Sequence, residues 1–115
     1  MKIANSKCRS LVEAREPFQG SNLWGVWSNS TLTKSEERFY VVYSWGHHFP
    51  IYIYDETTQQ WFGNADRFSQ STTRHQYHAR PRQEIHWLHT QAICVIAVCG
   101  YTELVRRRLT GEVVA

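Results

Sequence analysis

The segment from residue 38 to residue 64 constrains the fold of this chain more than any other. Its first run, Phe39–Trp45, consists mainly of β-branched and aromatic residues, which favour the pleated surface of a strand. Gly46 ends this run, and Pro50 begins a second one, where its missing N–H does least harm to strand pairing. A polar stretch and a short apolar run at Trp61–Phe62 follow. The pattern predicts a three-stranded antiparallel meander over residues 38–64.

Residues 84–110 predict a pair of helices. In the first half, apolar side chains recur every three or four residues, the spacing of one helix face. These side chains are Ile85, Leu88, Ala92, Val95, Ile96 and Cys99. A second helix is expected over Glu103–Leu109, with Thr102 as its N-cap and three Arg in its last turn. The run Ile93–Cys99 is also compatible with a buried strand, although its length and the preceding period favour the helix.

The remaining parts of the chain have weaker patterns. Residues 1–37 combine turn-forming Pro and Gly with a polar stretch, so this part is expected to be irregular. Residues 65–82 show no consistent period and are expected to form an Arg/His-rich loop or a short helix that crosses the sheet. With 115 residues, the chain has the size of one domain. The predicted fold class is α+β: a small antiparallel sheet of about three strands or more, with two C-terminal helices packed on one face. The other face is expected to be free and rich in aromatics.

Composition and motif content restrict the cellular compartment expected for the protein and the classes of function that it can have. No apolar run approaches the ~18 residues of a membrane span, and the first residues lack the apolar core of a signal peptide. The three Cys include no C-x-x-C pair, which suits a reducing compartment. P-loop, dinucleotide-binding, HExxH and GxSxG motifs are absent from the sequence. We therefore expect a cytoplasmic protein that contacts no membrane and needs no cofactor.

Basic residues are distributed unevenly along the chain. Residues 67–115 carry seven Arg and three acidic residues, whereas residues 1–66 carry six basic and seven acidic residues. The stretch Arg67–Arg82 contains four Arg, two His and no acid. The planar guanidinium of Arg can form two parallel hydrogen bonds with one phosphate, which the Lys ammonium cannot do. This stretch predicts contact with an anion or a nucleic acid, although a solvated surface loop is an equally simple interpretation.

Aromatic side chains on the expected strands could complete a nucleic-acid site. An aromatic strand face stacks unpaired bases while flanking Arg hold the phosphates. The candidate binding residues are Tyr43, Trp45, Tyr54, Arg74, His75, Arg80 and Arg82. The same aromatics could instead form the core beneath the helices, and a protein–protein interface favours the same residue types. The expected partner is a nucleic acid or a nucleoprotein complex, with the oligomeric state left open.

The histidines suggest an alternative, a His-dependent phosphodiesterase or nuclease. Metal-free hydrolysis of a phosphodiester can use one imidazole as base, another as acid, and a cation at the transition state. His47 and His75, with nearby Arg, could supply these groups. Six His in 115 residues produce such groupings by chance, so a non-enzymatic binding role is favoured. His86 and His89 have the i, i+3 spacing that could chelate a metal from one helix face, but no further ligand completes that site, and no metal is expected.

Three short motifs occur in an order that resembles small uncharacterised proteins of phages and plasmids. The motifs are Tyr43-Ser44-Trp45-Gly46, Pro50-Ile51 and Thr72-Thr73-Arg74-His75. The resemblance covers about Phe39 to Arg82, and Trp45 departs from the Tyr that is usual in those proteins. It implies a mobile-element origin, a compact α+β fold and an anti-defence role in the host cytoplasm, such as an anti-CRISPR-like inhibitor. It implies no particular reaction.

Overall fold

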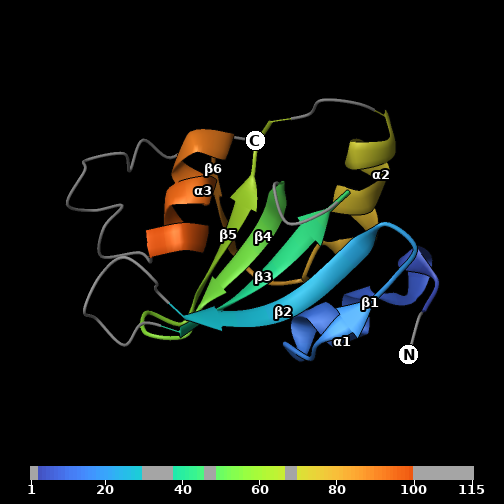
Figure 1. The fold of residues 1–115 in the computed structure, drawn as a ribbon, viewed down its shortest axis with the longest axis horizontal. Helices are drawn as coiled ribbons and strands as arrows, with labels where there is room; N and C mark the ends of the chain where they lie inside the picture. Colours follow the sequence, from blue (N-terminus) through green and yellow to red (C-terminus); the bar gives the residue numbers. More distant parts are fainter. Residues whose placement is uncertain (1–2, 30–37, 46–48, 67–69, 100–115) are drawn as a thin grey trace.

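The computed structural model describes residues 3–29, 38–45, 49–66 and 70–99. The strands are β1 (Phe18–Gln19), β2 (Leu23–Asn29), β3 (Arg38–Ser44), β4 (Pro50–Asp55), β5 (Gln60–Asn64) and β6 (Ile85–Leu88). The helices are the short 3-10 helix η1 (Asn5–Lys7), α1 (Arg9–Glu13), α2 (Gln70–Ala79) and α3 (Thr90–Cys99). Figure 1 shows the strands side by side in one twisted sheet, with α3 and α2 toward opposite ends of the view.

All six strands belong to a single mixed sheet in the order of the chain. Each strand from β1 to β5 is antiparallel to the next, whereas β6 is parallel to β5. A parallel pair needs a long crossover connection, and α2 lies in this one. The expected fold, a small antiparallel sheet with two C-terminal helices on one face, is therefore wrong in strand number, strand direction and helix placement.

The N-terminal part is not irregular, because it adds β1 and β2 to the sheet. β2 pairs with β3 along its whole length, from Leu23 opposite Ser44 to Asn29 opposite Arg38. β1 reaches β2 only because position 25 is Gly: a Cβ there would collide with the Phe18 ring and the Tyr40 hydroxyl. The aromatic rings of neighbouring strands can then cross above the Gly backbone.

The helix expected over residues 84–99 is instead a strand followed by a shorter helix. Ile85 to Leu88 form β6, and α3 begins at Thr90. The helix starts there because the Asp66 carboxylate accepts hydrogen bonds from the Thr90 N–H and hydroxyl, both at 2.8 Å. Such a carboxylate satisfies donors that the first turn of a helix leaves unpaired. The second expected helix, Glu103–Leu109, lies outside the described residues.

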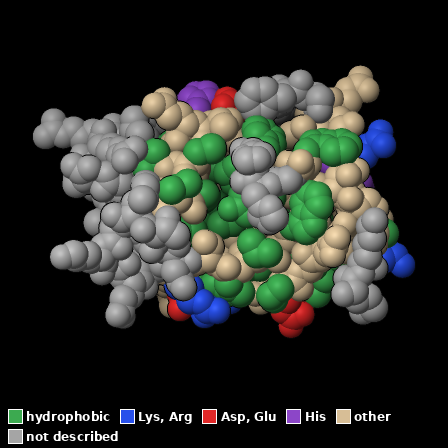
Figure 2. Space-filling model, in the orientation of Figure 1, with side chains coloured by type: hydrophobic (Ala, Val, Ile, Leu, Met, Phe, Trp, Pro, Cys, Tyr) green, Lys and Arg blue, Asp and Glu red, His purple; other side chains and the backbone are tan. Residues whose placement is uncertain are grey.

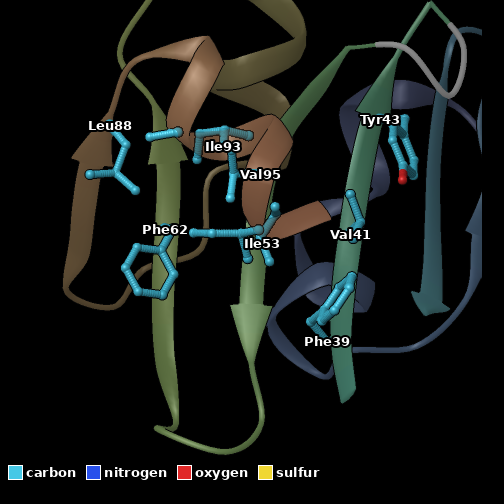
Figure 3. Close-up of a cluster of buried hydrophobic side chains, with 10 residues drawn as sticks. Phe39, Val41, Tyr43, Ile53, Phe62, Leu88, Ile93 and Val95 are labelled. Carbon is cyan, nitrogen blue, oxygen red and sulfur yellow. The ribbon is translucent and has the colours of Figure 1, made fainter. Parts of the chain in front are cut away.

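Helices cover both faces of the sheet, so the aromatic-rich free face does not exist as expected. α3 packs on one face and closes a core that includes Phe39, Val41, Ile53, Phe62 and Ile93 (Figure 3). α1 and α2 cover the other face, over a second core. That core contains Cys8, Val12, Phe18, Leu23, Tyr40, Val42, Ile51, Tyr52, Trp61 and Ala79. Alternation along β3 sends successive side chains to opposite cores.

The described surface and helices show where apolar and charged side chains lie. On the face seen in Figure 2, hydrophobic side chains gather near the middle, and Lys and Arg side chains lie at the margins. No helix in the described parts of the chain is long and apolar enough to cross a bilayer.

Candidate nucleic-acid interface

The candidate site is built around α2, which occupies most of the segment expected to be an Arg/His loop or a short helix. Its buried residues are Thr72, His75, Gln76 and Ala79, whose spacing of three and four residues makes one face that packs on the sheet. Arg74 and Tyr77 lie on the opposite, exposed face. The helix therefore separates two flanks, each of which meets a different part of the sheet.

Three side chains from elsewhere in the chain hold the last turn of α2. The Tyr52 hydroxyl donates to Gln76 O at 2.7 Å, and Arg9 Nη2 donates to Tyr77 O at 2.8 Å. The Cys8 thiol donates to His78 O at 3.6 Å. Burial raises the pKa of Cys8 to about 11, so the thiol keeps its proton and remains a donor. These bonds satisfy carbonyls that a helix end leaves unpaired, and they fix where α2 lies.

A hollow of about 420 Å³ opens along one flank of α2, and we call it the Trp45 hollow. It is lined by Ala4, Asn5, Ser6, Ser21, Asn22, Trp45, Ser71, Arg74, His75 and His78. Its volume lies within the range of about 300–1,000 Å³ that is typical of ligand pockets. The described lining residues include one Arg, two His and several hydroxyl and amide groups, and no acid. Its chemistry suits an anion.

Trp45 stands at the mouth of this hollow in an unusual backbone conformation. Its φ is 65°, in the left-handed region that costs an L-residue about 1–2 kcal/mol. The Trp45 N–H donates to Asn22 O at 2.9 Å, which anchors Trp45 directly after β3. The side chain is 56% exposed, the highest exposure of any described Trp. A strained backbone that presents an exposed indole is typical of a residue retained for contact with a ligand.

His75 is the buried member of the hollow and is fixed by a hydrogen bond. His75 Nδ1 and Ser44 Oγ are 2.6 Å apart, and the ring centroids of His75 and Trp45 are 5.2 Å apart. Burial lowers the pKa of His75, and His78 and Arg74 lower it further by charge repulsion. His75 is therefore neutral at physiological pH. Because Ser44 engages Nδ1, the ring nitrogen Nε2 remains for a ligand.

Two further nitrogen-bearing side chains line the hollow: the Arg74 guanidinium, which is always charged, and the His78 imidazole. Within the described ranges, no carboxylate forms an ion pair with either side chain. Arg74 is exposed and His78 is half-buried, so both can reach a ligand at the surface. The structure thus brings together three of the residues that the sequence singled out: Trp45, Arg74 and His75.

The other expected contact residues lie elsewhere. Tyr43 is 9% exposed and belongs to the core under α3, whereas Tyr54 lies on the opposite face of the sheet. The Arg15 guanidinium covers the Tyr54 ring, with its Cζ 4.4 Å from the ring centroid. An aromatic row formed by Tyr43, Trp45 and Tyr54 together is therefore not present.

Two Arg of the candidate set differ in their surroundings. Arg82 forms a bidentate pair with Glu13, at 3.1 Å for both Nε–Oε2 and Nη2–Oε1, so its charge is already neutralised. Arg80 lies over the Trp87 ring, with its Cζ 5.1 Å from the centroid. Of these two, only Arg80 is available to an external anion.

The histidine-based alternatives receive limited geometric support. His47 lies outside the described residues. His86 belongs to β6 and packs on Phe62, whereas His89 precedes α3 and contacts Asp66 Oδ1 at 2.7 Å. Their i, i+3 spacing therefore does not fall on one helix face. Across the part of the chain that the structure describes, no three His, Cys, Asp or Glu side chains gather to hold a metal ion.

Sequence reasoning missed the residues that the N-terminal part brings to the hollow. Asn5 and Asn22 come from segments expected to be irregular, and both line the hollow with amide groups. Tyr77 was missed as well, although it lies three residues after Arg74 and so shares its helix face. The spacing of Arg74 and Tyr77 is visible in the sequence, but it places both side chains on one face only if residues 70–79 form a helix.

Comparisons with family models, curated proteins and solved structures found no match to this chain. The resemblance to phage and plasmid proteins stays a prediction.

Proposed function

We propose that this protein binds a nucleic acid at the Trp45 hollow, with a phosphate held by Arg74 and a base stacked on Trp45. The observation that carries this proposal is the meeting of an exposed, strained indole with a guanidinium that has no carboxylate partner among the described residues, in a hollow whose described lining contains no acid. Four segments far apart in the sequence supply that lining. Stacking plus an adjacent cation is how proteins hold unpaired nucleotides.

The neutral groups of the hollow add directional contacts. His75 is held in one orientation by Ser44, and an uncharged imidazole gives or accepts one hydrogen bond without the desolvation cost of a buried charge. Asn5 Oδ1 already accepts a hydrogen bond from the Ser21 N–H, so Asn5 offers its NH₂ donors, whereas the Asn22 amide carries both donors and an acceptor. These groups suit sugar hydroxyls and base edges. A ligand with a phosphate, a sugar and a base would use all of these groups.

A single strand fits this site better than a duplex. A base can stack on Trp45 only when it has left its own base stack, as in single strands, loops and ends. A nucleoprotein complex of the host displays the same groups where its nucleic acid is exposed. Inhibition of such a complex is the form that an anti-defence role of this protein would take.

The proposal is tested with a fluorescent single-stranded oligonucleotide titrated at two salt concentrations. Wild type is expected to bind at low salt, and Trp45→Asn and Arg74→Ala are expected to weaken binding by roughly tenfold or more each. Arg38→Ala is the matched control, because Arg38 lies at the other end of β3 and stacks on Trp27 with its Cζ 4.0 Å from the ring. Absence of binding by wild type at low salt would refute the proposal.

A second candidate, a metal-free phosphodiesterase, is favoured by one feature of the same hollow. His75 and His78 line it together with Arg74, which supplies a neutral base, a second imidazole and a cation. A labelled oligonucleotide incubated with the protein in EDTA would be cut by wild type and not by His75→Ala. Intact substrate after prolonged incubation would exclude this activity.

A further inference from the structure

A second hollow, of about 190 Å³, lies along the other flank of α2, and we call it the Trp87 hollow. It is lined by Tyr52, Thr73, Gln76, Tyr77, Arg80 and Trp87. Its volume is below the range of about 300–1,000 Å³ typical of whole-ligand pockets, so it suits a fragment such as one planar ring system. The described lining residues again include no acid.

The Trp87 ring is held firmly against the sheet. Trp87 pairs with Gly63 of the parallel neighbour β5, and a Cβ at position 63 would lie 2.8 Å from the ring. The Tyr52 ring meets it edge-on with centroids 6.2 Å apart, and Arg80 lies over it. The lining of this hollow thus combines a half-buried indole with an Arg, as Trp45 and Arg74 do in the lining of the first hollow.

Gln76 supplies an observation that points to a ligand. Its side-chain NH₂ donates to Asn64 O at 3.0 Å and to Asp66 O at 3.1 Å, which fixes the orientation of the amide. Its Oε1 is buried and has no hydrogen-bond partner among the described residues, although the residue is only 4% exposed. A buried acceptor left unpaired destabilises a protein by about 1–3 kcal/mol. A ligand that donates an N–H to Oε1 would remove this cost.

The exposed face of α2 joins the two hollows. Residues 71, 74, 75 and 78 line the first hollow, and residues 73, 76, 77 and 80 line the second, so the hollows lie on either side of one helix. A helix with its side chains is about 10–12 Å across. Tyr77 is 67% exposed on this crest, with the Arg9 Cζ 5.4 Å from its ring centroid. Aromatic and cationic groups therefore continue from one hollow to the other.

We propose that the Trp87 hollow is a second base subsite, so that the ligand is a single-stranded oligonucleotide that crosses α2. This inference rests on the proposed function and adds the ligand's length and path. One base stacks on Trp45. Another stacks on Trp87 in place of the Arg80 guanidinium, which moves from the ring to a phosphate, and an amino or imide N–H of that base donates to Gln76 Oε1. Arg74 and Arg80 contact phosphates on the two sides of the crest. Every common base carries such a donor, so the subsite does not select a sequence by this bond alone.

The test measures affinity for a mononucleotide and for a labelled decanucleotide by fluorescence anisotropy and competition. Arg80→Ala is expected to weaken decanucleotide binding by roughly five- to tenfold and to leave mononucleotide binding unchanged. Trp87→Phe, which keeps a ring beside Gly63, is expected to act in the same way. Arg82→Ala is the matched control, because this neighbouring Arg pairs with Glu13 and lines neither hollow.

The two proposals fail in different ways. If Trp45→Asn weakens decanucleotide binding while Arg80→Ala and Trp87→Phe match wild type, the second subsite is wrong and the Trp45 hollow remains the binding site. If a mononucleotide binds as tightly as the decanucleotide, the path across α2 is also wrong. If wild type binds neither ligand at low salt, both proposals are refuted. Because Arg80 is exposed, Arg80→Ala keeps the test informative even if Trp87→Phe does not fold.

Discussion

Two residues of the candidate site, Trp45 and His75, adopt conformations or surroundings that lower the local stability of the fold. Trp45 holds a left-handed backbone conformation that Gly or Asn would adopt with less strain, and its side chain remains largely exposed. His75 is an imidazole buried next to Arg74 and His78. Both choices are unfavourable for the folded chain and useful to a ligand, which is the pattern expected of functional residues.

Replacing Trp45 by Asn is expected to leave the free energy of unfolding within about 1 kcal/mol of wild type, because relief of the left-handed strain offsets the lost ring contacts. Urea unfolding at pH 7 measures this. Trp61→Ala is the contrast, since Trp61 is 2% exposed and its loss should cost about 3–5 kcal/mol. A loss of more than about 2 kcal/mol in Trp45→Asn would show that the indole serves the fold.

The lowered pKa of His75 gives stability a defined dependence on pH. As pH falls below the ordinary His value of 6.5, the unfolded chain takes up a proton before folded His75 does. The contribution of neutral His75 is therefore complete above that value and is lost as pH falls toward its folded pKa. His75→Gln should show a flatter decline in stability than wild type between about pH 7 and pH 5 by urea unfolding. Equal slopes for the two proteins would contradict this prediction.

Among the elements, α3 depends on a cap that lies 24 residues away in sequence. Asp66 accepts hydrogen bonds from the Thr90 N–H and hydroxyl, and it also contacts His89 Nδ1. The hydrogen bond from the Thr90 N–H holds the pKa of Asp66 below its ordinary value, with burial opposing and the other contacts assisting. The start of the helix is thus tied to the end of β5.

Asp66→Ala is expected to lower the free energy of unfolding at pH 7 by about 1 kcal/mol through loss of this cap. Because the folded pKa is lowered, the contribution of Asp66 is present above the ordinary value of 3.8 and is lost as pH falls below it. The difference between wild type and variant should therefore shrink in urea unfolding as pH falls from about 5 to about 3. Glu56→Ala, at an exposed pair with Arg38, is the control and should change stability by less than about 0.5 kcal/mol.

Local patterns predicted some elements well and others poorly. The meander was predicted because alternation and turn residues specify each strand within its own segment, and β3, β4 and β5 are confirmed. Ile85 and Leu88 extended a helical period by coincidence, since four residues fit either a strand or a helix turn. β6 is a strand because it pairs with β5, and pairing across a crossover leaves no local trace.

The candidate site was predictable only in part for the same reason. Trp45, Arg74 and His75 were predicted as contact residues because the residue types at the end of β3 and in α2 are distinctive. The structure places all three in the lining of one hollow. Tyr43 and Tyr54 lie on opposite faces of the sheet. The alternation of side chains along a strand indicates that each strand has two rows of side chains, but it does not indicate which face of the sheet a helix will cover. The Arg82–Glu13 pair joins positions 69 residues apart, which no local pattern shows.

For the molecule as a whole, the position of the cations matters more than the net charge. The chain carries only +3, which is modest for a nucleic-acid-binding protein. Arg82 pairs with Glu13, and Arg38 pairs with Glu56 and lies over the Trp27 ring. Arg15 lies over the Tyr54 ring. Arg9, Arg74 and Arg80 lie around α2 without a carboxylate partner among the described residues. Binding should therefore use few phosphate contacts and depend strongly on stacking.

The salt dependence of binding measures that balance. Three phosphate contacts on a single strand predict a slope of about −2 for log K against log salt, since each contact contributes about −0.7. Affinity should then fall roughly twentyfold between about 50 mM and 200 mM salt.

A slope near zero would mean that Arg9, Arg74 and Arg80 contact no phosphate. A slope steeper than about −4 would mean that other Arg, such as the run Arg106–Arg108, join the interface. A change of about 0.7 in slope for Arg74→Ala, with none for Arg38→Ala, would assign one of the contacts to the Trp45 hollow.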